Sequence, residues 1–249
     1  MTILSVWQAV RRPVPGFSYE VPASDERGIR IRELLLVSAV ALAGPVMGNI
    51  FAFSGSPLPD SVQLTRMRLL NTIVSEMIAL AVLAYVLGRR SWGLRTLGFS
   101  FSWFDLPMSL AIGALGYFFV NITFVLMWVA QWVLNARSLV LANPHTVLSS
   151  GVSLLTILVV IINPFFEELI LRSYFTTEIA GLTNRLWVGT TASVIIQTSL
   201  HAYQGPVNMV VVGAMFVVFS VYFAKTQRIL PIILAHMYFD IWALLRASA

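Results

Sequence analysis

Long runs with few or no charged residues divide most of this chain into segments of about 20 residues or more, the length that an α-helix needs to cross a bilayer. Seven such apolar segments follow one another, at 34–53, 69–88, 106–134, 152–175, 186–204, 206–224 and 229–245. Open sheets cannot satisfy their edges in lipid, and the chain lacks the alternating pattern of membrane strands. The pattern predicts an all-α, polytopic transmembrane helix bundle of about seven spans, with six to eight compatible with the length.

The composition excludes other classes of protein. Charged residues make up 11% of the 249 residues and hydrophobic residues 58%, whereas a soluble domain carries about 25% charged residues. A soluble enzyme, a disordered chain and a nucleic-acid-binding module are therefore excluded, and the lipid bilayer is the expected environment. Cysteine is absent, which rules out disulfide bonds, a cysteine nucleophile and thiolate metal ligands.

The first 33 residues are polar and mixed in charge, and we expect residues 1–33 to form a cytoplasmic arm that lies partly on the membrane surface. Its apolar start is too short for the core of a signal peptide. Residues 34–249 form the predicted bundle, with the residues of chemical interest between 160 and 241. The protein is expected to be a multi-pass protein of the cell (plasma) membrane.

Charge bias sets the predicted orientation. With the N-terminus inside, eleven Lys and Arg residues lie on the cytoplasmic side: Arg11, Arg12, Arg27, Arg30, Arg32, Arg89, Arg90, Arg95, Arg185, Lys225 and Arg228. Four lie outside: Arg66, Arg68, Arg137 and Arg246. Because cytoplasmic loops are enriched in Lys and Arg, the N-terminus is predicted to be cytoplasmic.

A cluster of charges within the fourth apolar segment needs an explanation. Glu167 and Glu168 are adjacent, and Arg172 follows four residues after Glu168. Each such group costs about 2.5–3.5 kcal/mol at membrane depth, so it needs a partner or a function. Glu168 and Arg172 share a helix face and are predicted to form an ion pair. Glu167 is left without a local partner, which suits a general base; a purely structural ion pair at a helix end is the alternative.

Two histidines in later segments are further candidates. His201 follows an apolar stretch, and His236 and Asp240, four residues apart, share a face of the last segment. The turn at 181–185 is equally far from Glu167 and His201, so antiparallel helices would place these two residues at one level. A single histidine on an apolar helix is more often structural, but two of the 3 histidines of this chain lie in these segments.

Two other ionisable residues are not expected to take part. Glu76, in the second segment, is interpreted as a buried carboxyl that is protonated or hydrogen-bonded. His145 lies between apolar segments and is expected to be solvated.

The sequence Glu167-Glu168-x-x-x-Arg172, followed by His201 and then by His236-x-x-x-Asp240, resembles the CAAX protease and bacteriocin-processing family of intramembrane proteases, also called the Abi family. Its motifs are EExxxR, FxxxH and HxxxN or HxxxD. The resemblance covers residues 160–241, about a third of the chain. Gln197 departs from the second motif, because the family usually has an aromatic residue there.

The resemblance implies hydrolysis of a peptide bond within the membrane. The substrate is a prenylated CAAX tail in eukaryotic members, and a peptide, a bacteriocin precursor or a membrane regulator in prokaryotic members. By motif, Glu167 would be the general base and His201 would hold and polarise the water. His236 and Asp240 would face the scissile carbonyl, with Glu168 and Arg172 in support.

Two questions stay open in the sequence. The reaction either proceeds without a metal or uses Zn²⁺, for which the candidate ligands are Glu167, His201, His236 and Asp240. No two of these ligands have the close sequence spacing of a typical zinc site, which favours a metal-independent reaction. The alternative functions are a non-catalytic membrane scaffold or immunity protein of the same fold, and a proton-coupled transporter, which also carries ionisable groups at membrane depth.

The predicted orientation can be tested by cysteine labelling, since the chain has no cysteine of its own. In a Ser24→Cys variant, we expect an impermeant maleimide to label the thiol only after the cytoplasmic face is opened. Labelling of intact cells from outside would contradict the prediction.

Overall fold

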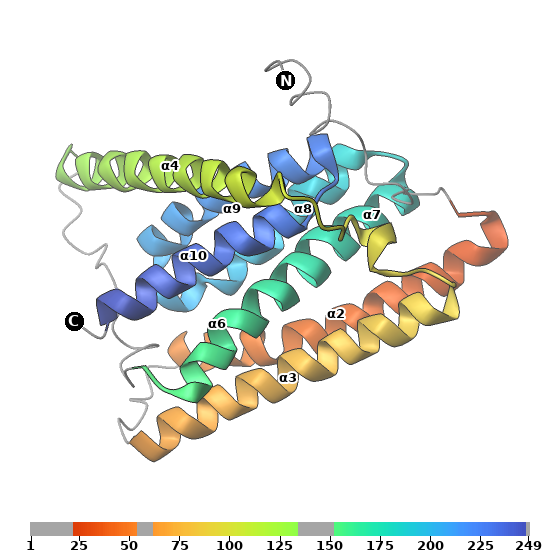
Figure 1. Ribbon diagram of the computed structural model, residues 1–249, viewed down its shortest axis with the longest axis horizontal. Helices are drawn as coiled ribbons and strands as arrows, with labels where there is room; N and C mark the ends of the chain where they lie inside the picture. The colour runs from red at the N-terminus through yellow and green to blue at the C-terminus, as the bar shows by residue number, and fades with distance from the viewer. Residues whose placement is uncertain (1–21, 54–61, 134–151, 248–249) are drawn as a thin grey trace.

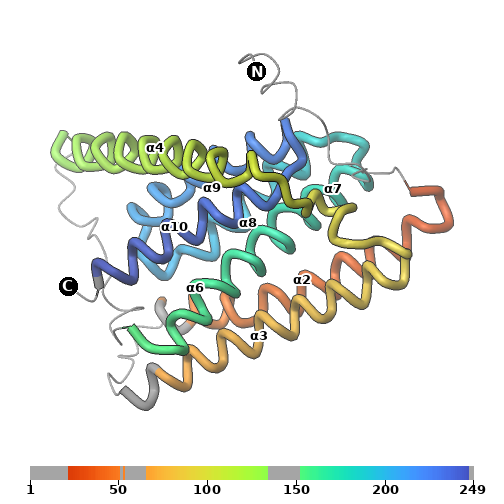
Figure 2. The backbone as a smooth tube through the Cα atoms, viewed as in Figure 1, coloured from red at the N-terminus to blue at the C-terminus, as the bar shows by residue number. Residues whose placement is uncertain are grey.

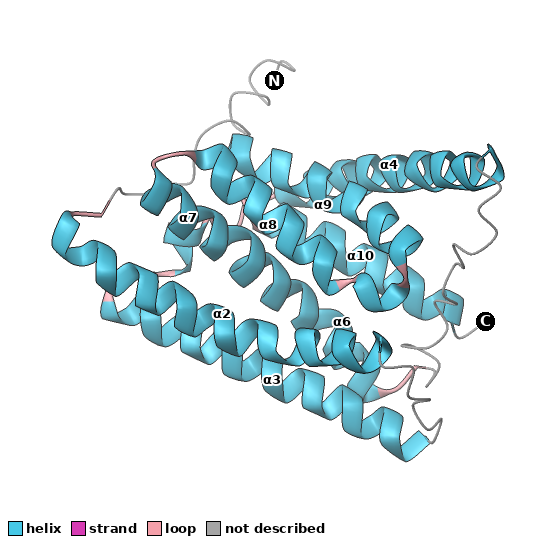
Figure 3. Ribbon diagram, turned by 180° about the vertical axis from the view of Figure 1, so that it is seen from behind, coloured by secondary structure: helices cyan, strands magenta, loops and turns pink. Residues whose placement is uncertain are grey.

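A computed structural model describes residues 22–53, 62–133 and 152–247, and the regular elements of this part are all helical (Figure 3). The prediction of an all-α polytopic bundle is confirmed. The helices are α2 (Ser24–Phe53), α3 (Val62–Arg89), η1 (Leu94–Leu97), α4 (Asp105–Val133), α6 (Leu154–Phe166), η2 (Glu167–Tyr174), α7 (Phe175–Thr183), α8 (Leu186–Leu200), η3 (Ala202–Gln204), α9 (Pro206–Thr226) and α10 (Leu230–Ala247).

Each of the seven apolar segments contains helix. Five helical stretches of the described residues are long and apolar enough to cross a membrane: Ser24–Ile50, Arg66–Arg89, Asp105–Val133, Leu154–Thr183 and Pro206–Thr226. Helix α8 is shorter, with 15 residues. Helix α2 already begins at Ser24, so its first turns belong to the predicted arm; residues 1–21 of that arm, and His145, lie outside the described residues.

One continuous helical rod crosses the middle of the molecule. Helices α6, η2 and α7 follow one another without a break, as the tube in Figure 2 shows. The long pair α2 and α3 packs along one side of the rod, and α4, α9 and α10 lie on the other side (Figure 1). Helix α8 packs against α7 and α9. The rod is therefore placed to carry side chains into the centre of the bundle.

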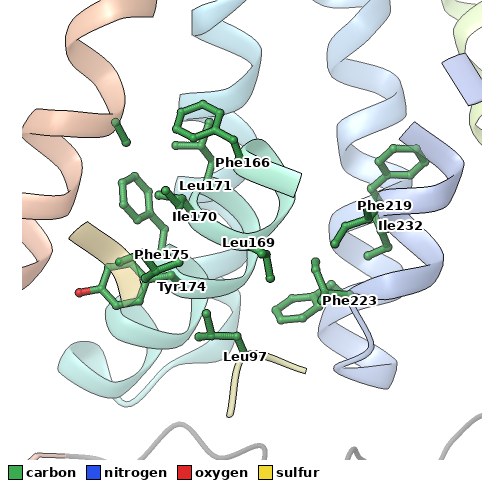
Figure 4. Close-up of a cluster of buried hydrophobic side chains, with 14 of the residues drawn as sticks. Leu97, Phe166, Leu169, Ile170, Leu171, Tyr174, Phe175, Phe219, Phe223 and Ile232 are labelled. Atoms are coloured by element: carbon green, nitrogen blue, oxygen red, sulfur yellow. The ribbon is translucent and has the colours of Figure 1, made fainter. Parts of the chain in front are cut away.

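The apolar core surrounds the middle of this rod. Figure 4 shows side chains of α6, η2 and α7 near those of η1, α9 and α10, including Leu97, Leu169, Phe219 and Ile232. The backbones of helices α7 and α8 are in close contact at Gly189, where an added Cβ would lie only 2.4 Å from the carbonyl oxygen of Thr176. This close packing fixes the position of α8 relative to the rod.

Buried ion pairs join the helices at one end of the bundle. Glu178 of α7 accepts hydrogen bonds from Arg30 Nε at 3.0 Å and from Arg90 Nη1 at 2.7 Å, and Arg90 also pairs with Glu33. Burial lowers the pKa of Arg90, but Glu178 and Glu33 outweigh it and raise the pKa above its ordinary value. Asp105 of α4 accepts hydrogen bonds from two guanidinium nitrogens of Arg228, Nε and Nη2. Several residues assigned to the cytoplasmic side therefore meet at one end.

Candidate active site

The paired glutamates lie on a π-helix at the centre of the rod. Helix η2 runs from Glu167 to Tyr174, and the amide of Phe175 donates to the carbonyl oxygen of Ile170 five residues earlier. Such π-helical turns are rare and occur often at functional sites. The sequence spacing predicts an ordinary α-helix here, so the wider turn is a finding of the structure.

Glu168 and Arg172 form the predicted ion pair, and both side chains are completely buried. Arg172 also donates from Nη1 to the carbonyl oxygen of Phe216, 3.1 Å away, and to the hydroxyl of Ser220. Glu168 accepts a second hydrogen bond, at 2.9 Å, from Nδ1 of His236. The pair is therefore bonded to both α9 and α10, which satisfies the charges that the core encloses.

Glu167 forms no such ion pair with a described residue. Its side chain lies beside Asn163, whose Nδ2 is 3.4 Å from Oε1 of Glu167. The other carboxylate oxygen, Oε2, is buried and has no hydrogen-bond partner among the described residues. A buried carboxylate oxygen that only accepts is open to a donor such as water. The structure thus gives the two adjacent glutamates different surroundings: Glu168 is in an ion pair, while Glu167 contacts the Asn163 amide and keeps one oxygen without a partner among the described residues.

His201 lies at the end of α8 rather than within it, where the backbone leaves the helix with φ −90° and ψ 8°. Its Nδ1–H donates to the carbonyl oxygen of Gln197 at 2.9 Å, because that oxygen can only accept. In the neutral ring, Nε2 is then an acceptor. Gln197, the departure from the family motif, is completely buried and lies near the rod, with Nε2 3.5 Å from the carbonyl oxygen of Glu167.

Asn49 of α2 holds the turn that carries His201. Its Oδ1 accepts from the amide of Tyr203 at 2.8 Å, and its Nδ2 donates to the carbonyl oxygen of Ser199 at 3.2 Å. These two backbone groups flank His201 on either side. No local sequence pattern predicts this contact, because Asn49 precedes the turn by about 150 residues and only tertiary packing brings them together.

His236 and Asp240 share a face of α10, as predicted. Nε2 of His236 lies 3.8 Å from Oδ1 of Asp240, which is too long for a direct hydrogen bond. Because Nδ1–H is bonded to Glu168, each nitrogen of His236 faces a carboxylate oxygen. The ring is fixed by its buried partner Glu168, while the Asp240 side chain keeps 29% of its surface exposed.

Several of the predicted residues lie near one another. Phe216 contacts both imidazole rings, with centroid distances of 5.1 Å to His201 and 6.2 Å to His236. Asp240 lies within electrostatic range of Glu167 as well as of His236. Helices η2, α8 and α10 thus supply the side chains that could bind and activate a water molecule between them.

Two further residues lie near this cluster, and the interpretation of Glu76 as a buried, hydrogen-bonded carboxyl agrees with its contacts. Tyr203 stacks on the ring of His201 and is within electrostatic range of Glu167 and Asp240. Glu76 accepts a hydrogen bond from Asn163 at 2.8 Å and also interacts electrostatically with Glu167 and Asp240. The signal for Glu76 was its charge within an apolar segment, but the sequence could not place α3 beside α6.

Within the described ranges, no three His, Asp or Glu side chains are close enough together to hold a metal ion. The described side chains of the cluster are carboxylates and imidazoles around a polar centre.

Residues 149–242 match the model of the Rce1-like family, described as type II CAAX prenyl endopeptidase Rce1-like. The predicted family resemblance is confirmed. The match spans all of the motif residues from Glu167 to Asp240, and together with the apolar helices it indicates a protease of the membrane. No curated protein and no solved structure gives a significant match to the chain.

The ion pair can be tested by replacing Glu168 with Gln. This change leaves Arg172 buried without a countercharge, and breaking such a pair costs about 3–5 kcal/mol. We expect a clearly lower midpoint of thermal unfolding in detergent than in wild type. The control is Glu26→Gln, which changes an exposed glutamate of α2 in the same way. A Glu168→Gln protein that is fully stable but inactive would mean that the two glutamates have exchanged roles.

Proposed function

We propose that this protein is an intramembrane endopeptidase that hydrolyses a peptide bond with a water molecule activated by Glu167 and His201. The observation that carries the proposal is the buried Oε2 of Glu167, which has no hydrogen-bond partner among the described residues. A carboxylate in this state gains by accepting a hydrogen bond from water and then a proton. The match to an endopeptidase family supports the same chemistry.

Each side chain of the cluster has a different role in the proposed reaction. Glu167 Oε2 takes a proton from the water, while Nε2 of His201 accepts a hydrogen bond from its other O–H group. The water oxygen bonds to the carbonyl carbon, and His236, protonated on both nitrogens, donates from Nε2 to the developing oxyanion. When the C–N bond breaks, Glu167 returns the proton to the leaving nitrogen. Glu168 orients the His236 ring, and Asp240 faces the scissile carbonyl beside it.

The substrate class follows from the position of the site. The cluster lies among helices that are apolar enough to cross a membrane, so the substrate is a peptide that enters from the membrane or is anchored to it. We infer a membrane-associated or lipidated peptide or protein, of the CAAX type suggested by the matched family or of the bacteriocin-precursor or regulator type. The proposed location is the cell (plasma) membrane.

The role of Glu167 is tested by Glu167→Gln, which keeps the shape of the side chain and removes its basicity. Loss of a general base costs about 10²- to 10⁴-fold, so we expect kcat to fall by at least about 10²-fold. The measurement is cleavage of a fluorogenic prenylated peptide, and of its unprenylated form, by protein in proteoliposomes. Glu26→Gln, far from the cluster, serves as the control.

Near-normal turnover by folded Glu167→Gln protein would refute the assignment. A wild-type protein that cleaves neither peptide nor any membrane peptide of a library would instead favour a non-catalytic scaffold of the same fold.

Metal dependence is tested at Asp240. We propose a metal-independent reaction, because the described cluster does not bring three metal-binding side chains together. Asp240→Asn should then keep substantial activity, since an amide can still donate and accept hydrogen bonds. Strong chelators should leave wild-type cleavage nearly unchanged. Stoichiometric Zn²⁺ in the purified protein, with activity lost on its removal and restored on its return, would refute this reading.

A further inference from the structure

Glu76 is a buried carboxyl that the reaction described above does not use. It lies on α3, outside the residues matched by the family, and only 5% of its surface is exposed. Its Oε1 accepts a hydrogen bond from Nδ2 of Asn163, and its Oε2 has no partner among the described residues. Burying a carboxyl with so few hydrogen bonds lowers stability. A carboxyl buried in this way is a candidate for a functional role.

Asn163 connects Glu76 to the proposed base. Its Nδ2 lies 2.8 Å from Oε1 of Glu76 and 3.4 Å from Oε1 of Glu167. An amide nitrogen carries two hydrogens, so it can donate to both carboxyl groups at once. The contact with Glu76 is shorter and therefore stronger, and it sets the orientation of the amide. The remaining N–H is then directed towards Glu167.

The other groups around Glu76 belong to the same site. It lies within electrostatic range of Glu167 on η2 and of His236 and Asp240 on α10. The neighbouring helix α2 places Gly44 beside Ser75, the residue that precedes Glu76. The side chain of Glu76 is therefore part of the polar centre of the bundle, although α3 carries none of the family motifs.

We propose that Glu76 is a positioning residue for Glu167. By fixing the Asn163 amide, it holds Oε1 of Glu167 in place and leaves Oε2 free for the water. This inference rests on the proposed function of Glu167. It assigns a role in the reaction to the N-terminal helix pair, which the motifs do not cover.

The first experiment measures kcat and KM for Glu76→Gln, Glu76→Leu, Asn163→Leu and the double variant Glu76→Leu/Asn163→Leu. Gln still accepts the hydrogen bond, so its kcat should stay within a few-fold of wild type. Loss of a supporting hydrogen bond typically costs about 10- to 100-fold, and we expect Glu76→Leu to lower kcat by this factor with little change in KM. The double variant should be no worse than the poorer single variant, because both act through one hydrogen bond.

The control is Ser75→Ala, which changes the adjacent residue of α3 and removes only a local hydrogen bond to the carbonyl oxygen of Thr72. Its kcat should equal that of wild type. Multiplicative losses in the double variant would overturn the inference. Equal loss of activity in folded Glu76→Gln and Glu76→Leu would also overturn it, because the charge rather than the hydrogen bond would then matter.

Two measurements need no cleavage and separate this inference from the proposed function. The same variants should show non-additive changes in thermal unfolding, and a structure of Glu76→Leu should show the Glu167 carboxylate displaced from its wild-type position. An unmoved carboxylate overturns the positioning role even if wild type cleaves peptides. Failure of wild type to cleave, with the displacement present, overturns the protease function and leaves the positioning of Glu167 established.

Discussion

The buried network of Glu168, Arg172 and His236 is the interaction on which the rest of the site depends. Charges in an apolar core are tolerated only when each is paired and hydrogen-bonded. Here the guanidinium bonds to Glu168 and to α9, and Glu168 also accepts from α10. The network therefore does more than neutralise a charge, since it fixes the rotation of the central rod relative to the helices that face it. His236 owes its orientation to this arrangement.

A consequence of this network is that adjacent glutamates have different environments. The π-helical turn directs Glu168 into the ion network, while Glu167 lies beside Asn163 with one oxygen unpartnered. A single carboxylate could not both neutralise Arg172 and accept a proton from water. In the proposed reaction the two residues divide these tasks, since Glu168 neutralises Arg172 and Glu167 acts as the base.

The N-terminal helices are more than a scaffold for the motif region. Asn49 of α2 bonds to the backbone on both sides of His201, and Glu76 of α3 reaches Glu167 through Asn163. Each of these contacts supports one of the two groups proposed to activate water. The ion pairs of α2 and α3 with Glu178 anchor the same helix pair to the rod. The residues matched by the family thus depend on contacts from outside the match.

The sequence by itself determined the helices and the contacts within them. Apolar segments of membrane-spanning length predict a helical bundle, because lipid leaves the backbone few other ways to satisfy its hydrogen bonds. A spacing of four residues predicts the Glu168–Arg172 pair, because one turn brings such residues together. Only the tertiary structure decided which helix faces which. It therefore also decided that His236 bonds to Glu168 and that Glu76 is linked to Glu167 through Asn163. The widening of η2 into a π-helix is likewise visible only in the structure. Contacts between helices depend on packing and rotation across long sequence separations, and the local spacing of residues carries no information about either.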